Sequence, residues 1–317
     1  MDIYRFILDF LDDSEYILQK TSGTTGSPKI IKLSKQALFE SAKRTATFFQ
    51  LKESDRAVLC LPINYIAGKM MVVRALYAGL NLITIEPSGT PDFSGLRKID
   101  FCAMVPMQAA NLIKQNLWPP LKTLILGGAE TNSDLIKQLQ LVNTAVFETY
   151  GMAETCSHIA LKKLNGLNSE DCFTALPDIN LSIDERACLI INAPFLSTEI
   201  RTNDSVELVS KNKFKWLGRF DNVINSGGIK IQPEELEKQI QEILQIPCAI
   251  IGIADELLGQ KIALILETEK EIDSAHLFSQ LVPHINKKFL PKSITYIKKL
   301  PRNPSFKIDR IKLKELI

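Results

Sequence analysis

Along the middle of the chain, short runs of apolar residues alternate with longer segments in which apolar residues recur every three or four positions. The short runs are AVLCL at 57–61, NLITI at 81–85, FCAMV at 101–105, TLILG at 123–127 and AVFETY at 145–150. Such continuous runs are typical of strands buried on both faces. Helical periodicity occupies the segments between them, such as 35–49 and 133–142. This alternation predicts an α/β fold with a mainly parallel sheet.

The pattern changes twice towards the carboxyl end. After Asp171 the apolar runs become short and turn-bounded (NLSI, ACLIINA, VELVS and KFKWLG), which predicts an antiparallel section that closes a large domain. After Asp221, helical segments at Pro233–Leu244 and Ala275–Phe289 flank strand-like runs at Cys248–Ile253 and Ile262–Leu266. We therefore expect a large domain over residues 1–221 and a small α+β domain over residues 222–317.

Composition narrows the class of protein. A formal net charge of +2 with interleaved signs gives no basic face for nucleic acid. The longest apolar region, Ile63–Ile85, contains Lys69 and Arg74, so no membrane span is expected. The acidic amino terminus is unlike a basic secretory signal, so a cytoplasmic protein is expected. The six cysteines form no CxxC pair and are expected to be buried thiols in a reducing cytosol: Cys60, Cys102, Cys156, Cys172, Cys188 and Cys248.

The strongest local signal is the segment TSGTTGSPK at 21–29. Its glycines allow close backbone approach, its hydroxyls donate hydrogen bonds, and its lysine adds a positive charge, so the loop can wrap an anion. It is not a Walker loop, because Pro28 stands where that motif has glycine. A polar turn is the alternative. The candidate anion-binding residues are Thr21, Ser22, Gly23, Thr24, Thr25, Gly26 and Lys29.

This segment resembles the phosphate-binding loop of the adenylate-forming superfamily, which includes the acyl-CoA synthetases and other AMP-binding enzymes. The segment YGMAET at 150–155, which follows Thr149 and includes Gly151, resembles the family motif YGxTE. The resemblance implies that Tyr150 packs on adenine and that Glu154 holds Mg²⁺, a role that suits a carboxylate. Ala153 replaces the usual threonine, so one phosphate hydrogen bond of the family is not expected here.

Two further segments match the family. GGAE at 127–130 resembles the segment that lines the adenine and acyl pockets and marks Gly128 and Ala129, although a plain strand-to-helix turn is equally consistent with it. TND at 202–204 resembles the TGD motif, whose aspartate accepts hydrogen bonds from both ribose hydroxyls. The resemblance gives this role to Asp204, with Asn203 in place of glycine.

The carboxyl-terminal matches concern domain movement and catalysis. Residues 218–231 resemble the hinge and thioester-forming loop: the resemblance implies that Arg219 contacts ribose or phosphate, that Asp221 is the pivot and that Gly228 lies beside the pantetheine tunnel. A surface hairpin is the alternative. PRNPSFKIDR at 301–310 resembles the segment whose lysine bridges the acyl carboxylate and the α-phosphate, which marks Lys307 as catalytic; Phe306 stands where glycine is usual.

The matches run in family order from Thr21 to Arg310. They imply an enzyme with a mobile small domain that uses ATP, Mg²⁺ and coenzyme A to activate a carboxylic acid. Only 20 residues precede the phosphate loop, so we expect the family's first subdomain, which contributes to the coenzyme A site, to be missing.

The acid is indicated by LPINYIAGKMMVVRAL at 61–76. This segment contains no acidic residue for an α-ammonium group, which disfavours amino acids. Tyr65 stands where many acyl-CoA ligases have histidine, and Lys69 and Arg74 would suit an acid with a second carboxylate, the alternative being solvated helix charges.

This segment, YGMAETCSHIALK and the short amino terminus resemble the compact o-succinylbenzoate–CoA ligases of menaquinone biosynthesis. An aryl or medium-chain acyl-CoA ligase is the alternative within the enzymes. An inactive nucleotide-binding relative is the alternative of another class, because Ala153, Asn203 and Phe306 depart from the motifs. The oligomeric state is left open.

Overall fold

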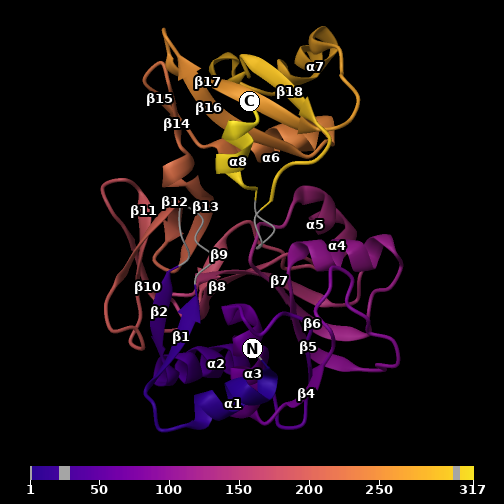
Figure 1. Cartoon of the computed structure of the whole chain (residues 1–317), viewed down its shortest axis with the longest axis vertical. Helices are drawn as coiled ribbons and strands as arrows, with labels where there is room; N and C mark the ends of the chain where they lie inside the picture. The colour runs from indigo at the N-terminus through magenta and orange to yellow at the C-terminus, as the bar shows by residue number, and fades with distance from the viewer. Residues whose placement is uncertain (1, 21–28, 303–307) are drawn as a thin grey trace. The chain divides into compact units, whose positions relative to one another are not determined.

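The computed structural model describes residues 2–20, 29–302 and 308–317 (Figure 1). The chain divides into two compact units. Residues 1–182, 190–200 and 208–215 form the first unit, and residues 183–189, 201–207 and 216–317 form the second. The predicted boundary at Asp221 falls inside the second unit, and its role as a pivot stays a prediction.

A long mixed sheet runs through the chain in the order β10-β11-β12-β13-β9-β8-β7-β6-β5-β3-β4. Pairing is parallel from β4 to β7 and antiparallel for β7–β8, β8–β9 and β9–β13, which confirms the expected α/β fold with an antiparallel section. The strands of the parallel part are β3 (Arg56–Leu59), β4 (Asn81–Thr84), β5 (Ile99–Met104), β6 (Leu121–Leu126) and β7 (Ala145–Met152). Those of the antiparallel part are β8 (Ser157–Lys163), β9 (Phe173–Ala175), β10 (Asn180–Ile183), β11 (Cys188–Asn192), β12 (Ile200–Ser210) and β13 (Lys213–Arg219).

Alternate residues of the parallel strands face two different cores, as the period of a strand requires. Ala57 and Phe101 pack on the face covered by α2 (Lys35–Phe49) and α3 (Ile66–Ala78), whereas Val58 and Cys102 pack on the face covered by α4 (Pro106–Lys114) and α5 (Ser133–Leu139) (Figure 1). The first core also takes in α1 (Ile3–Leu11) and the antiparallel hairpin of β1 (Tyr16–Lys20) and β2 (Ile30–Ser34). Both faces of the parallel part of the sheet are therefore covered by helices.

The helix between β2 and β3 begins after a capping serine. Ser34 is its N-cap, and the Ser34 hydroxyl accepts a hydrogen bond from the Ala37 N–H at 3.3 Å. The helix α3 begins after Tyr65 and ends at Gly79, whose φ of 64° favours glycine. The helix α5 is shorter than predicted, because the helix expected at 133–142 ends at Leu139.

The second unit contains a five-stranded sheet in the order β15-β14-β17-β16, with β18 pairing in parallel with β17. Its strands are β14 (Ile224–Ser226), β15 (Ile229–Ile231), β16 (Cys248–Asp255), β17 (Gly259–Glu267) and β18 (Ser293–Ile297). Leu236 of α6 (Pro233–Leu244) and Leu277 of α7 (Ser274–Leu281) pack on one face, and Leu313 of α8 (Arg310–Glu315) packs on the other. This is the α+β arrangement that the sequence predicts.

One predicted helix of the second unit is too long. The periodicity predicts a helix over Ala275–Phe289, but α7 ends at Leu281 and only a short 3-10 helix, Lys287–Phe289, follows. Pro283 explains the early end, because proline has no N–H with which to continue the helical hydrogen bonds and its ring clashes with the preceding turn.

The cysteines are free thiols. Five of them are buried as expected, but Cys172 is only half-buried. Within the described part of the chain, no helix has the length and apolar character needed to cross a membrane.

Candidate active site

The turn between β7 and β8 presents the predicted magnesium ligand. Glu154 is exposed on this turn, just after a β-bulge at Tyr150 and Gly151. The φ angles of Cys156 and Ser157 are 61° and 155°, so two consecutive residues other than glycine have positive φ. Backbone strain of this kind is concentrated at functional sites.

Local contacts hold the turn in this shape. The Thr155 hydroxyl is buried, accepts a hydrogen bond from the Met152 N–H at 2.9 Å and lies 2.6 Å from the Ser157 carbonyl oxygen. At Gly151, a Cβ atom would stand 2.2 Å from the same carbonyl oxygen, so a side chain there would displace the backbone. These contacts define the backbone conformation of the turn that presents Glu154.

Tyr150 belongs to an aromatic cluster. Its ring centroid lies 5.0 Å from that of Phe214 and 5.8 Å from that of Phe173, and the residue is 9% exposed. Packing on two rings fixes the tyrosine in one orientation. Stacking of Tyr150 on adenine stays a prediction.

The ends of β6 and β7 approach closely beside this tyrosine. The Thr149 hydroxyl donates a hydrogen bond to the Leu126 carbonyl oxygen at 3.0 Å, and a Cβ atom on Gly127 would stand 2.5 Å from Thr149 Oγ1. Gly128 follows with a φ of 84°. The GGAE segment, which includes Ala129, is thus a tight turn at the carboxyl end of a parallel strand, where ligands of open α/β sheets bind.

Magnesium fits this donor set. The described residues contain no group of three or more His, Cys, Asp or Glu side chains that could enclose a metal ion. Mg²⁺ usually takes only one or two protein carboxylates, with substrate phosphates and water as the other ligands. An exposed carboxylate such as that of Glu154 suits this coordination.

The two cations of α3 are both buried, so the alternative of solvated helix charges is wrong. Lys69 is 3% exposed, and its ammonium donates to Gln19 Oε1 at 2.8 Å and to the Leu18 carbonyl oxygen at 3.3 Å. Burial lowers the pKa of Lys69. The ammonium therefore already has partners on β1.

Arg74 has different surroundings. It is 1% exposed, and its Nη2 donates to Ser157 Oγ at 2.9 Å and to His158 Nδ1 at 3.4 Å. Its Nε has no partner, and no carboxylate of the described residues forms an ion pair with it. Burial lowers the pKa of Arg74 to about 9, so the guanidinium stays cationic at neutral pH. Tyr65, at the start of the same helix, is 39% exposed.

In the second unit, the predicted ribose ligand Asp204 lies next to the predicted pivot. Asp204 accepts hydrogen bonds from Trp216 Nε1 at 3.3 Å and from Arg219 Nη1 at 3.4 Å. Arg219 also donates to Asp221 at 3.0 Å. Burial lowers the pKa of Arg219, but the two aspartates outweigh it and leave that pKa raised. One guanidinium thus joins both carboxylates.

Asn203, the residue that departs from the family motif, joins the same network. Its amide nitrogen lies 3.2 Å from both carboxylate oxygens of Asp221, and its amide oxygen accepts from Arg186 Nη1 at 3.1 Å. Asp221 itself lies in a 3-10 helix, Phe220–Asn222, directly after β13.

Gly228 is the second residue of the turn between β14 and β15. The φ angles of Gly227 and Gly228 are 58° and 81°, as in the two-residue turns that favour glycine. The predicted thioester-forming loop is therefore a hairpin, but its place beside a pantetheine tunnel stays a prediction.

Several predicted residues lie outside the described residues. They are Thr21, Ser22, Gly23, Thr24, Thr25, Gly26, Phe306 and Lys307. Lys29, at the edge of the phosphate loop, is described and exposed.

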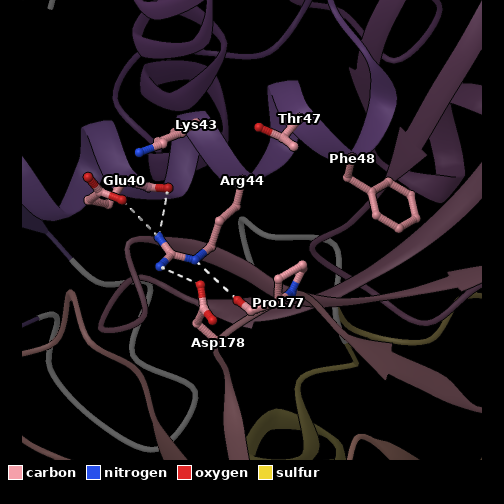
Figure 2. Close-up of a pocket in the computed structure, with 7 residues that line it drawn as sticks. All are labelled: Glu40, Lys43, Arg44, Thr47, Phe48, Pro177 and Asp178. Atoms are coloured by element: carbon pink, nitrogen blue, oxygen red, sulfur yellow. Dashed lines mark hydrogen bonds and ion pairs between the residues drawn. The ribbon is translucent and has the colours of Figure 1, made fainter.

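Figure 2 shows a pocket of the first unit that contains none of the predicted residues. It lies between α2 and the segment before β10. Arg44 fills much of it, with hydrogen bonds to the Glu40 side chain and to the Pro177 carbonyl oxygen and with Asp178 at 4.0 Å. These contacts connect a helix to a loop, so the pocket has a structural explanation.

Ser157 and His158 are the site residues that sequence reasoning missed. They contact Arg74, although 83 and 84 positions separate them from it in the chain. The only signal is their place two and three residues after the YGMAET segment.

The strand-end turns, the strained β7–β8 turn and the exposed Glu154 define an α/β protein with a site suited to a nucleotide. Residues 11–192 match the family described as AMP-binding enzyme. The chain belongs to this family.

A curated relative and two solved structures extend the comparison. The 2-succinylbenzoate–CoA ligase of Lactococcus lactis is 25% identical over 96% of this chain and 72% of its own length. An acyl-CoA synthetase (AMP-forming)/AMP-acid ligase II-like protein from Dyadobacter fermentans is 33% identical, with 99% of this chain and 93% of that chain covered and a TM-score of 0.64. It is therefore similarly short.

The o-succinylbenzoate CoA synthetase of Bacillus subtilis, in complex with its acyl-adenylate intermediate, has a TM-score of 0.81 at 22% identity. The match covers 94% of this chain and 68% of that chain. This likeness shows the fold.

Proposed function

We propose that the protein is an ATP-dependent acid–CoA ligase that activates o-succinylbenzoate and transfers the acyl group to coenzyme A. Family membership supports the adenylation step, and the curated relative that aligns with 96% of the chain supports this acid. The product would serve menaquinone biosynthesis.

In the first half-reaction, a carboxylate oxygen of the acid attacks the α-phosphate of ATP and pyrophosphate leaves. Glu154 would hold Mg²⁺, which when bound offsets charge on the phosphate oxygens. Asp204 is a suitable acceptor for the ribose hydroxyls, and Tyr150 offers a ring to adenine. Lys307 would stabilise the charge that develops at the α-phosphate.

In the second half-reaction, the thiol of coenzyme A loses its proton and attacks the acyl carbon, and AMP leaves. The resemblance assigns this step to the loop around Gly228, after a rotation about Asp221.

The observation that carries the choice of acid is the buried guanidinium of Arg74. A charge in the protein interior without a counter-ion is costly, and a substrate carboxylate would remove that cost. Ser157 is half-buried and accepts a hydrogen bond from Arg74, which leaves its own O–H free to donate to a ligand. The ring carboxylate of o-succinylbenzoate would bind to this pair.

Pyrophosphate release with ATP, Mg²⁺ and a panel of acids tests the proposal. We expect kcat/KM to be higher for o-succinylbenzoate than for benzoate, octanoate or 4-oxo-4-phenylbutanoate, which has the same keto acid but no ring carboxylate. Faster turnover of benzoate or octanoate would leave only a general acid–CoA ligase, and no pyrophosphate release with any acid would favour an inactive relative.

Two buried cations of one helix provide a matched pair of variants. Arg74→Met should lower kcat/KM for o-succinylbenzoate more than kcat/KM for 4-oxo-4-phenylbutanoate. The expected difference corresponds to roughly 1–3 kcal/mol, the usual range for a hydrogen bond to a charged group. Lys69→Met should leave the ratio between the two acids unchanged, because its ammonium binds Gln19. An equal change of that ratio in both variants would count against Arg74 as the acid-binding cation.

A further inference from the structure

A continuous series of hydrogen bonds runs from the β7–β8 turn into the core of the first unit. Arg74 donates to both Ser157 and His158, His158 Nε2 lies 3.3 Å from the Thr45 hydroxyl, and Thr45 lies 3.1 Å from the Ser41 carbonyl oxygen. Thr45 is completely buried, and His158 is 6% exposed. Only Ser157, at the outer end, is more than marginally exposed.

The direction of each hydrogen bond follows from the chemistry of the groups. Arginine only donates, so His158 Nδ1 must be the acceptor and cannot carry a proton. At the inner end, the Ser41 carbonyl oxygen only accepts, so the Thr45 hydroxyl donates to it. The Thr45 oxygen is then an acceptor for a proton on His158 Nε2. The contacts are consistent with a single tautomer of the imidazole.

We infer that His158 is a positioning residue whose unprotonated Nδ1 orients the Arg74 guanidinium towards Ser157 and so makes the site selective for an acid with a second carboxylate. The inference rests on the proposed function of the site. It adds a residue, and a required tautomer, that neither the motifs nor the comparisons identify.

The protonation states of His158 and Arg74 support this hydrogen-bond arrangement. Burial, followed by the nearby Arg74 cation, lowers the pKa of His158 well below its usual value. A protonated imidazole would also place an N–H at Nδ1 against the Arg74 N–H, so two donors would face each other. His158 is therefore neutral while Arg74 is cationic. The positive charge of the pair is then on the Arg74 guanidinium, which contacts Ser157.

Two near-isosteric substitutions distinguish the roles of the two ring nitrogens of His158. In His158→Asn the amide can keep an acceptor near the position of Nδ1, and in His158→Gln it can keep a donor near the position of Nε2. We expect His158→Gln to lower the ratio of kcat/KM for o-succinylbenzoate over 4-oxo-4-phenylbutanoate by about tenfold, as expected for the loss of one charge-assisted hydrogen bond. His158→Asn should keep that ratio within about threefold of the unmodified protein.

Turnover of 4-oxo-4-phenylbutanoate should change little in either variant, which a general loss of stability would not allow. An equal fall for both acids, or the same ratio in His158→Asn and His158→Gln, would make His158 a purely structural residue. If the unmodified protein shows no preference for the second carboxylate, the proposed acid fails, and selectivity by His158 fails with it.

The tautomer can be tested without any substrate. The chain has three histidines, so the ring ¹⁵N resonances of His158 can be assigned by their loss in His158→Gln. At neutral pH we expect a neutral ring with its proton on Nε2. A proton on Nδ1, or a doubly protonated ring, would overturn the positioning role even in an enzyme that prefers o-succinylbenzoate.

Discussion

The ε-ammonium of Lys307 is expected to act in only one half-reaction. Lys307→Ala should slow formation of the acyl-adenylate by on the order of a hundredfold or more, because a preorganised charge at the reacting phosphate is lost. Thioester formation from supplied acyl-adenylate should persist. Pyrophosphate release measures the first step, and thioester yield from acyl-adenylate and coenzyme A measures the second.

Lys299→Ala is a suitable control for this substitution, since Lys299 is an exposed lysine of the same unit with no assigned role. It should leave both steps unchanged. Equal losses in the two steps of Lys307→Ala would contradict the division of labour between the half-reactions.

Residue identity was predictable, but residue surroundings were not. The sequence marks Lys69 and Arg74 as equal candidates, whereas the structure gives Lys69 a partner on β1 and leaves Arg74 without a carboxylate. Ser157 and His158 escaped prediction because their contact with Arg74 depends on how α3 packs against β8. A motif records spacing along the chain and contains no information about that packing.

At the scale of elements, the β14–β15 hairpin is expected to serve the second half-reaction. Gly228→Leu should slow thioester formation by on the order of tenfold or more, because the side chain would obstruct the path of pantetheine, and should spare pyrophosphate release. No atom lies within 4 Å of the position of a Cβ at Gly228, so the described residues leave room for a side chain there.

Backbone strain at the positive φ of residue 228 could also slow the Gly228→Leu variant, so this effect must be distinguished from obstruction of the pantetheine path. Gly95 provides the control, because its φ is 77° and a Cβ there would also meet nothing within 4 Å. Gly95→Leu should lower stability by a similar amount, about 1–2 kcal/mol, without changing thioester formation. Similar kinetic losses in both variants would assign the effect of Gly228→Leu to backbone strain alone.

Elements were predicted well wherever one local signal decides them. Buried parallel strands produce continuous apolar runs, and Ser34 and Pro233 mark helix starts by capping and by a fixed φ. The errors lie at helix ends, where apolar periodicity continues past the last turn. Pro283 was the available signal for the end of α7, and the periodicity of the following residues obscured it.

At the scale of the whole molecule, chain order does not determine which residues form a unit. The second unit includes residues 183–189 and 201–207 as well as everything from Trp216 onwards, because β10, β11, β12 and β13 contribute residues to both units. A sequence can indicate a change of pattern near Asp221, but it cannot indicate such an exchange of segments. The predicted ribose ligand Asp204 belongs to the second unit for this reason.

Rotation about Asp221 is the property of the whole molecule that the proposed reaction requires. Asp221→Pro should spare pyrophosphate release and slow thioester formation by on the order of a hundredfold, because proline fixes φ at about −65°. That value lies within the range of about −50° to −70° for a 3-10 helix, so the φ of the starting conformation suits proline. Accumulation of acyl-adenylate in the presence of coenzyme A is the measurement.

The control for this variant is Asp221→Ala, which removes the hydrogen bonds from Arg219 and Asn203 without restricting φ. It should transfer the acyl group faster than Asp221→Pro does. Because proline also restricts Phe220, the two variants must first be shown to unfold at similar temperatures. Equal loss of both half-reactions in Asp221→Pro, or equal thioester rates in the two variants, would show that the residue acts through its carboxylate and not as a pivot.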